Sequence, residues 1–351
     1  MSYEKDFTPS IHQQLLKSLM EQDYHFHTFS DYLGFQKDDS KESRTHKKCV
    51  ILRHDVEKYY DNALTMANIQ NELGIRGSYY FRILPHHFQP EVIKEIANLG
   101  HEIGYHYDDL AACGGVHEKA ILRFQKNLQT IRDIAPVKTI CMDGSPLSKF
   151  DNKDLWRAGE LVKVRAGEGA KVGAGELARG RVGEKVRTEH AGYHYSDFGI
   201  IGEPYYDMDF DDFFYLTDTG RCWDGWKVSV RDKVAQQERW IEEGLVFHST
   251  QDIINAIEQK AESERPKANS QEQEGVGVLA NWRVGEKEEE NSEMEQASSS
   301  VLRTSSHRSP IFPNRVMITF HPQRWHSGFL PWAKELVLQN AKNQVKRFLV
   351  K

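Results

Sequence analysis

Apolar and polar residues recur along much of the chain with the periods of helices and strands. After Ser10, a residue that can cap a helix, Ile11, Leu15 and Leu19 follow at helical spacing and predict an amphipathic helix. The polar stretch "DDSKESRTHKK" comes next and reads as a linker. We therefore assign residues 1–48 to an N-terminal helix and linker.

Beyond this linker, strand-like runs alternate with helix-like ones. The strand-like runs are "CVILRHD", "GSYYFRI", "HEIGYHY", "VKTICMDGSP", "FYLTD" and "RVMITFHPQRW", with shorter candidates in "GIIGEPYY" and "LVFHST". Helical patterns such as "NALTMANIQNELGI" and "EKAILRFQKNLQTIRDI" separate the early ones, and such alternation predicts parallel pairing. The pattern predicts an α/β fold, a distorted (β/α) barrel of about seven parallel strands over residues 49–351, with an open doubly wound sheet as the alternative.

Two segments interrupt this pattern. Residues 158–192 are a low-complexity stretch of Gly, Ala, Glu, Arg and Lys, and residues 261–310 are rich in Glu, Ser and Gln. Both have too few bulky apolar residues to form a packed core. We expect two inserts that lie outside the barrel.

Composition narrows the class of protein. The 351 residues carry a formal net charge of -6, which gives no overall basic field for nucleic acid or an anionic membrane. The four cysteines show no metal-binding or disulfide spacing and are expected to be free thiols. The N-terminus lacks an apolar leader, and no transmembrane segment is predicted. These features predict a soluble cytoplasmic protein, and they leave its oligomeric state open.

Polar side chains gather where the predicted strands end. They are Arg53, His54, Asp55 and Glu57 after the first strand, Arg82 after the second, His106, Asp108 and Asp109 after the third, Asp143 and Ser145 after the fourth, and His321, Gln323, Arg324 and Trp325 after the last. The C-terminal ends of barrel strands meet over one mouth. Carboxylates and imidazoles that meet there suit a divalent metal, which would activate water.

Several of these residues have a plainer interpretation. A single charged residue after a strand is ordinarily a solvated loop residue. His101 fits an orienting or core position as well as a ligand position, and Trp325 could pack in the core or stack on a sugar. The aromatic residues from Tyr79 to Phe81 are most simply packing residues of a strand buried on both faces.

Four segments, "CVILRHDVE", "GIRGSYYFRI", "LGHEIGYHYDDL" and "MITFHPQRW", together resemble the polysaccharide deacetylase superfamily, also called NodB-homology or carbohydrate esterase family 4 proteins. The closest likeness is to its divergent intracellular branch. The resemblance covers residues 50–142 well and residues 199–250 and 315–325 more loosely. It implies a distorted (β/α) barrel and the metal-assisted removal of an acetyl group from an N-acetylated sugar.

The resemblance also implies site residues. In that family one Asp is the general base, a second Asp and the two His of an H-x-x-x-H pair hold the metal, and a later His is the general acid. By position, Asp55 matches one aspartate, His106 the first metal-binding histidine and His321 the late acid. The second histidine is replaced by Leu110, and the doubled aspartate is missing, so the role of Asp55 as ligand or base stays open.

Taken together, these residues predict a metal-dependent hydrolase that removes an acetyl group from an N-acetylated sugar, in the assembly of a surface polysaccharide. The expected metal is Zn²⁺, held by Asp55, His106 and Asp109, with Asp143 or His321 as alternatives for the third ligand. The expected catalytic residues are Glu57 as base and His321 as acid. The expected substrate-binding residues are Arg53, His54, Arg82, Asp143, Arg324 and Trp325. The alternatives are an inactive carbohydrate-binding barrel and a hydrolase of a non-sugar amide or ester.

Overall fold

A computed structural model describes residues 5–37, 47–156, 192–227, 229–264 and 311–349 of the chain. Its strands are β1 (His25–His27), β2 (Cys49–Val56), β3 (Ser78–Phe81), β4 (Glu102–Tyr107), β5 (Val137–Met142), β6 (Phe214–Thr217) and β7 (Arg315–Phe320). Its α-helices are α1 (Pro9–Glu21), α2 (Phe29–Lys37), α3 (Tyr60–Glu72), α4 (Pro90–Asn98), α5 (Asp109–Ala112), α6 (His117–Arg132), α7 (Pro204–Asp207), α8 (Gln237–Glu242), α9 (Thr250–Glu264) and α10 (Phe329–Leu349). Short 3₁₀ turns are η2 (Asn152–Trp156), η3 (Tyr195–Phe198), η4 (Gly225–Lys227) and η5 (Pro322–Arg324).

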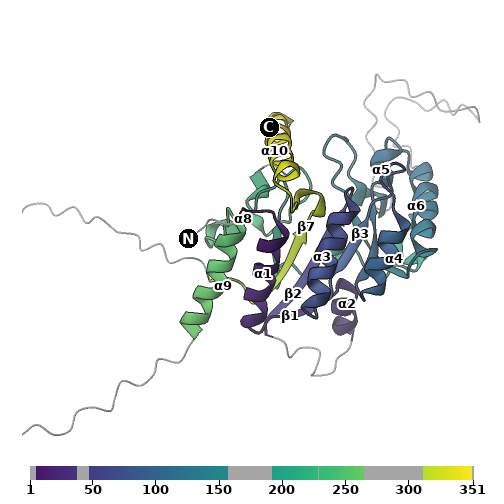
Figure 1. Ribbon diagram of the computed structural model, residues 1–351. Helices are drawn as coiled ribbons and strands as arrows, with labels where there is room; N and C mark the ends of the chain where they lie inside the picture. Colours follow the sequence, from purple (N-terminus) through teal and green to yellow (C-terminus); the bar gives the residue numbers. More distant parts are fainter. Residues whose placement is uncertain (1–4, 38–46, 157–191, 228, 265–310, 350–351) are drawn as a thin grey trace, which may run out of the picture.

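All seven strands pair in parallel in one sheet. Its order is β5-β4-β3-β2-β7-β6, with β1 pairing the start of β2 and β3 pairing its end. This is the chain order of a barrel opened between β5 and β6. The prediction of an α/β fold with seven parallel strands is confirmed, and Figure 1 shows the helices outside the sheet.

The sheet is so strongly curved that inward side chains meet across it. Arg53 of β2 donates to the Tyr215 hydroxyl of β6 at 3.4 Å, although β7 lies between these strands. Asp55 of β2 and Cys141 of β5 have potential ligand atoms within 4.8 Å of one another, although β3 and β4 separate their strands. Distant strands therefore share one interior, as the barrel prediction requires.

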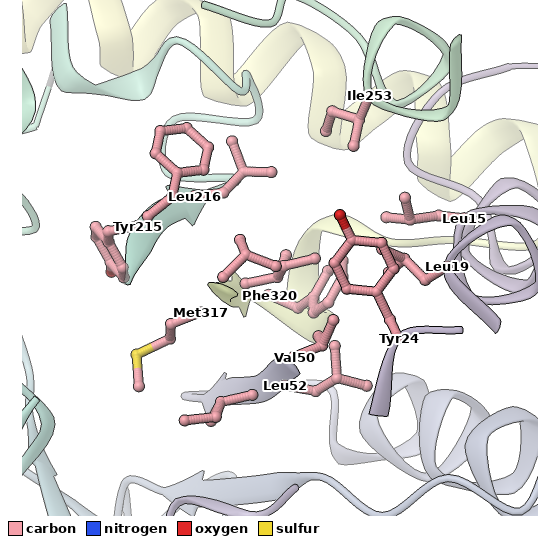
Figure 2. Packing of buried hydrophobic residues seen from close by; sticks show 14 of the residues in the cluster. Leu15, Leu19, Tyr24, Val50, Leu52, Tyr215, Leu216, Ile253, Met317 and Phe320 are labelled. Atoms are coloured by element: carbon pink, nitrogen blue, oxygen red, sulfur yellow. The ribbon is translucent and has the colours of Figure 1, made fainter. Parts of the chain in front are cut away.

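Two apolar clusters hold the helices against the outer face of the sheet. One joins α1 and α9 to β2, β6 and β7, and Figure 2 shows it at Leu15, Leu19, Ile253, Val50 and Phe320. The other joins α3, α4 and α6 to β3, β4 and β5. Strands β2 and β3 are buried at every position because they face helices outside and packed side chains inside.

The N-terminal segment belongs to this unit. β1 pairs with β2, and Leu15 of α1 lies in the same cluster as Ile253 of α9, so residues 5–37 do not form a separate region. Among the longer elements, the sequence pattern did not predict α2, α9 or α10, and it also did not predict the short strand β1. Of the weaker strand candidates, "GIIGEPYY" forms one bridge, from Gly202 to Thr139, before α7, and "LVFHST" leads into α9 without forming a strand.

The two predicted inserts lie almost wholly outside the described residues. The exceptions are residue 192 and residues 261–264, which continue α9 to its end. The second insert was therefore predicted to begin a few residues too early.

Candidate functional site

A cavity of about 590 Å³ lies at the ends of the strands. Every strand from β2 to β7 contributes to its lining, either by a residue of its own or by one that lies no more than two positions beyond its end. The residues that matter below are Arg53, Asp55, Arg82, His106, Asp143, Thr219, Asp232 and His321. Because parallel strands end at the same edge, the sheet collects their polar terminal residues into one space.

Asp55 and Arg53 form a buried ion pair on the inward face of β2. Arg53 donates from Nε to Oδ1 of Asp55 at 2.9 Å and from Nη2 to Oδ2 at 2.6 Å. The guanidinium also lies 4.8 Å from the ring centre of Tyr205. Burial disfavours its charge, but Asp55 and the neighbouring tyrosines outweigh burial and raise the pKa of Arg53 well above its ordinary value. Arg53 is therefore a fixed cation at the floor of the cavity.

His106 presents one ring nitrogen to the cavity. Its Nδ1 lies 3.1 Å from the carbonyl oxygen of Cys141, which can only accept, so Nδ1 carries a proton and Nε2 is the nitrogen that can offer a lone pair. That Nε2 lies 3.6 Å from Oδ2 of Asp143. Burial alone would raise the pKa of Asp143, but the charge of Arg82, together with hydrogen bonds from Ser145, lowers it. His106 is thus oriented as a ligand or proton acceptor beside an ionised carboxylate.

His321 is held by another buried carboxylate, Asp218, which directly follows β6. The Nδ1 of His321 lies 2.6 Å from Oδ1 of Asp218, and its Nε2 lies 4.0 Å from Oδ2 of Asp55. Asp218 also accepts from Arg324 at 2.8 Å and from the Trp325 indole at 2.6 Å. Burial opposes its charge, but His321 and Arg324 lower its pKa. An oriented imidazole beside a fixed carboxylate is the arrangement found in general acid and base catalysis.

Arg82 connects the wall of the cavity to a charged network behind it. Its Nε and Nη2 donate to Oδ2 of Asp108 at 2.8 and 2.6 Å, and its Nη1 lies 3.3 Å from Asp143 and 4.0 Å from Glu57. Arg123 fixes Asp108 from behind at 2.5 Å. Arg82 is consequently oriented with one donor group toward the cavity.

A further carboxylate, Asp232, lines the cavity. It accepts from the hydroxyls of Tyr205 at 2.6 Å and Thr217 at 3.0 Å, and also from those of Tyr215 and Thr219. Burial disfavours its charge, but Arg53 and His321 together with these hydroxyls lower the pKa of Asp232. Asp232 therefore ties the segment after η4 to the end of β6.

Most of the predicted site residues meet in this cavity. They are Arg53, Asp55, Glu57, Arg82, His106, Asp143, His321 and Arg324. The structure does not bring three others to it. His54 is on the outward face of β2, where it stacks on Tyr79 with ring centres 4.0 Å apart. Its neighbours Arg53 and Asp55 lie on the inward face, because successive side chains of a strand point to opposite sides of the sheet.

The other two absent residues are Asp109 and Trp325. Asp109 begins α5 and is fully buried, where it accepts from Tyr105 at 2.8 Å and from Arg123 at 2.6 Å. These partners hold it at the start of α5, and it does not line the cavity. Trp325 is buried against Phe7 and Phe320, so it packs in the core, which was one of the two roles considered for it. Its indole N–H donates to Asp218.

The sequence reasoning missed Asp218, Asp232 and Cys141. Asp218 ends the predicted strand "FYLTD" and could have been found by the same reading of strand ends that gave the other residues. Cys141 lies two residues before Asp143, on the same face of β5, and was expected to be an ordinary free thiol. Asp232 follows no strand, so no local signal marks it.

A donor set for a divalent cation is present at the floor. Asp55, His106 and Cys141 offer a carboxylate oxygen, an imidazole nitrogen and a thiol sulfur, all within 4.8 Å of one another. Such oxygen, nitrogen and sulfur donors are those that Zn²⁺ takes in proteins. Each Asp55 oxygen accepts one bond from Arg53 and keeps a further lone pair. The residues present fit a metal, with Asp143 close to the same imidazole.

The comparisons with known proteins add no relative. No family model, no curated protein and no solved structure matches the chain. None of the helices in the described part of the chain is both long and apolar enough to cross a membrane.

Proposed function

We propose that the cavity is the active site of a metal-dependent hydrolase that removes an acetyl group from an N-acetylated sugar. The observation that carries the proposal is the meeting of Asp55, His106 and the Asp218–His321 pair at one cavity, delivered by four different strands. A metal held by Asp55 and His106, with Cys141 or Asp143 as the third ligand, would lower the pKa of bound water and polarise the acyl oxygen.

The side chains divide the remaining chemistry among themselves. Water adds to the acyl carbon, the C–N bond breaks, and the products are acetate and the free amine. Glu57 lines the cavity and would take the proton from water, while Nε2 of His321 would protonate the leaving nitrogen. Asp218 would stabilise the imidazolium form of His321 through the 2.6 Å contact. Arg82 and Arg324 would position the substrate.

The setting of this activity is part of the proposal. All four cysteines are free, which suits a reducing compartment, and we propose a cytoplasmic enzyme acting on a carbohydrate precursor of a surface polysaccharide. The metal we propose is Zn²⁺, because the donor set includes a thiol and an imidazole.

One observation favours a second function, a binding barrel without catalysis. Both oxygens of Asp55 already accept from Arg53, and this pairing competes with a metal for the carboxylate. A sugar could then be bound by the same polar floor without turnover. The assay below separates the two functions.

The test measures acetate release by the full-length chain, supplied with Zn²⁺ or Co²⁺, from oligosaccharides of N-acetylglucosamine and from simple acetyl amides and esters. We expect turnover by the wild type and a loss of kcat of roughly 10²- to 10⁴-fold in His321→Asn and in Asp218→Asn. The matched control is His326→Asn, because His326 lies five residues further on and does not line the cavity. Unimpaired turnover by both site variants, or no acetate from any metal-loaded sample, would overturn the proposal.

A further inference from the structure

The cavity has a polar floor and an apolar rim. The floor carries the ion pair, histidines and carboxylates described above. The apolar residues of the rim are Pro146 and Leu147 from the segment between β5 and η2, Val230 from the segment after η4, and Leu338, Ala341 and Val345 from α10, which also presents Gln339 and Lys342 to the cavity. Among these, Leu147 is 86% exposed, Val345 58% and Leu338 44%. Three large apolar side chains are thus open to water around one entrance.

The exposure of Leu147 is imposed by a fixed loop. Arg231 donates from Nη1 to the carbonyl oxygens of Gly144 and Ser145 at 2.7 and 2.8 Å, and from Nη2 to that of Ser148 at 2.7 Å. Asn152 closes the loop from its other side through a 2.7 Å bond to the carbonyl oxygen of residue 143. Charged donors make such bonds strong, so this backbone is held while its apolar side chain stays in water.

Helix α10 supplies the other part of the rim. Leu338, Ala341 and Val345 follow one another at spacings of three and four residues and so lie on one face of the helix. Glu335, on the same side one turn earlier, is buried and lines the cavity, so this face of α10 is turned to the site. Figure 1 shows α10 beyond the end of β7, at the end of the barrel where the strands finish.

We propose that the substrate is amphipathic: its polar, acylated group lies on the floor, and an attached hydrocarbon chain lies against Leu147, Leu338 and Val345. The rim and the floor line one continuous cavity, so a molecule that is bound on the floor and is long enough extends onto the rim. The volume of about 590 Å³ is in the range that encloses a drug-sized ligand, more than one acetylated sugar unit requires. The inference depends on the proposed function only for the removal of the acetyl group at the floor. The binding of a hydrocarbon chain at the rim does not depend on it.

The test measures binding of the methyl, butyl and octyl β-glucosides to the full-length, metal-supplied chain by isothermal titration calorimetry, with the octyl compound kept below its micelle-forming concentration. These probes contain no amide, so the result does not depend on turnover. Each fully buried methylene strengthens binding about fourfold, and we expect affinity to rise at least about tenfold from methyl to octyl. A flat series in the wild type would overturn the inference even if the acetate assay succeeds.

Two variants locate the effect. Leu147→Asp and Leu338→Asp should each remove most of the gain from the longer chain, measured within each variant as the ratio of octyl to methyl glucoside affinity. The matched control is Leu122→Asp, since Leu122 is exposed on α6 and does not line the cavity. Retention of the full gain in both rim variants would overturn the inference. So would a wild-type dimer that Leu338→Asp dissociates, because a second copy of the chain would then cover the rim.

Discussion

The two faces of β2 carry polar residues of opposite character. On the inward face, Arg53 and Asp55 are charged, paired with each other and open to the cavity. On the outward face, His54 is uncharged and packed: burial lowers its pKa well below the ordinary value, and its Nε2 lies 2.8 Å from the amide nitrogen of Gln70. Consecutive polar residues of β2 therefore have different roles: Arg53 and Asp55 belong to the site, and His54 belongs to the core.

The outward face continues as a cluster of neutral polar side chains. Gln70 also accepts from the hydroxyl of Tyr79 at 3.0 Å, and His12 and His101 lie close by, both buried. A cation here would have no carboxylate partner within the cluster. The difference shows that position relative to the pleat, more than residue type, decides whether a histidine or a carboxylate serves chemistry or packing.

The largest effect on stability is expected from breaking the inward pair. Arg53→Met leaves Asp55 buried without its cation and should lower the free energy of unfolding by about 3–5 kcal/mol. Chemical denaturation measures this loss. The double variant Arg53→Met, Asp55→Leu should recover much of it, because no unpaired charge remains. A single variant as stable as the wild type would show that the two residues are not paired in the folded protein.

A smaller loss is expected on the outward face. His54→Ala opens a cavity beside Tyr79 and leaves the Gln70 amide without its partner, which should cost about 2–4 kcal/mol. Because His54 does not face the site, metal affinity of the folded protein should stay within about twofold of the wild type. Lower metal affinity with unchanged stability would place His54 in the site and contradict the division between the faces.

The effect that is smallest per step of the titration is a dependence of stability on pH, and it comes from the cluster on the outward face. Burial lowers the pKa of His101 from 6.5 to about 4, since its Nδ1 accepts from the backbone N–H of Gly77 and cannot take a proton there. The unfolded chain takes up the proton first, so this stability is present above pH 6.5 and is lost as the pH falls toward 4, by about 1.4 kcal/mol per pH unit.

Thermal or chemical unfolding between pH 7 and 4.5 measures this slope. His12, whose pKa burial lowers to about 3, should contribute in the same sense. His101→Asn keeps a donor and an acceptor without a titrating ring, so its stability should fall less steeply over this interval. An identical slope in wild type and variant would mean that His101 titrates alike in the folded and unfolded chains.

The fold was the more predictable part. Runs such as "CVILRHD" and "RVMITFHPQRW" form parallel strands, as predicted. The residues expected at the ends of the strands include Asp55, His106 and His321, and these three line the same cavity. The same reading failed at His54, because a run of letters does not reveal which side of the pleat each residue takes. It failed at Asp109, because β4 ends at Tyr107 and α5 begins at Asp109.

Long-range partners could not be predicted in the same way. Asp218 meets His321 only after β6 pairs with β7, more than one hundred positions along the chain. The pairing of Asp232 with hydroxyls of β6 depends on the course of an irregular segment. Neither contact leaves a periodic signal in the sequence.

The most direct test of the central claim is the divalent metal content of the purified full-length chain, measured by inductively coupled plasma mass spectrometry in wild type, Asp55→Asn, His106→Asn and His54→Phe. The account predicts about one equivalent of metal in the wild type and in His54→Phe, which keeps the stacked ring, and its loss in the two inward-face variants. A wild type that holds no metal after incubation with Zn²⁺, Mn²⁺ or Co²⁺, or inward-face variants that hold as much as the wild type, would contradict it.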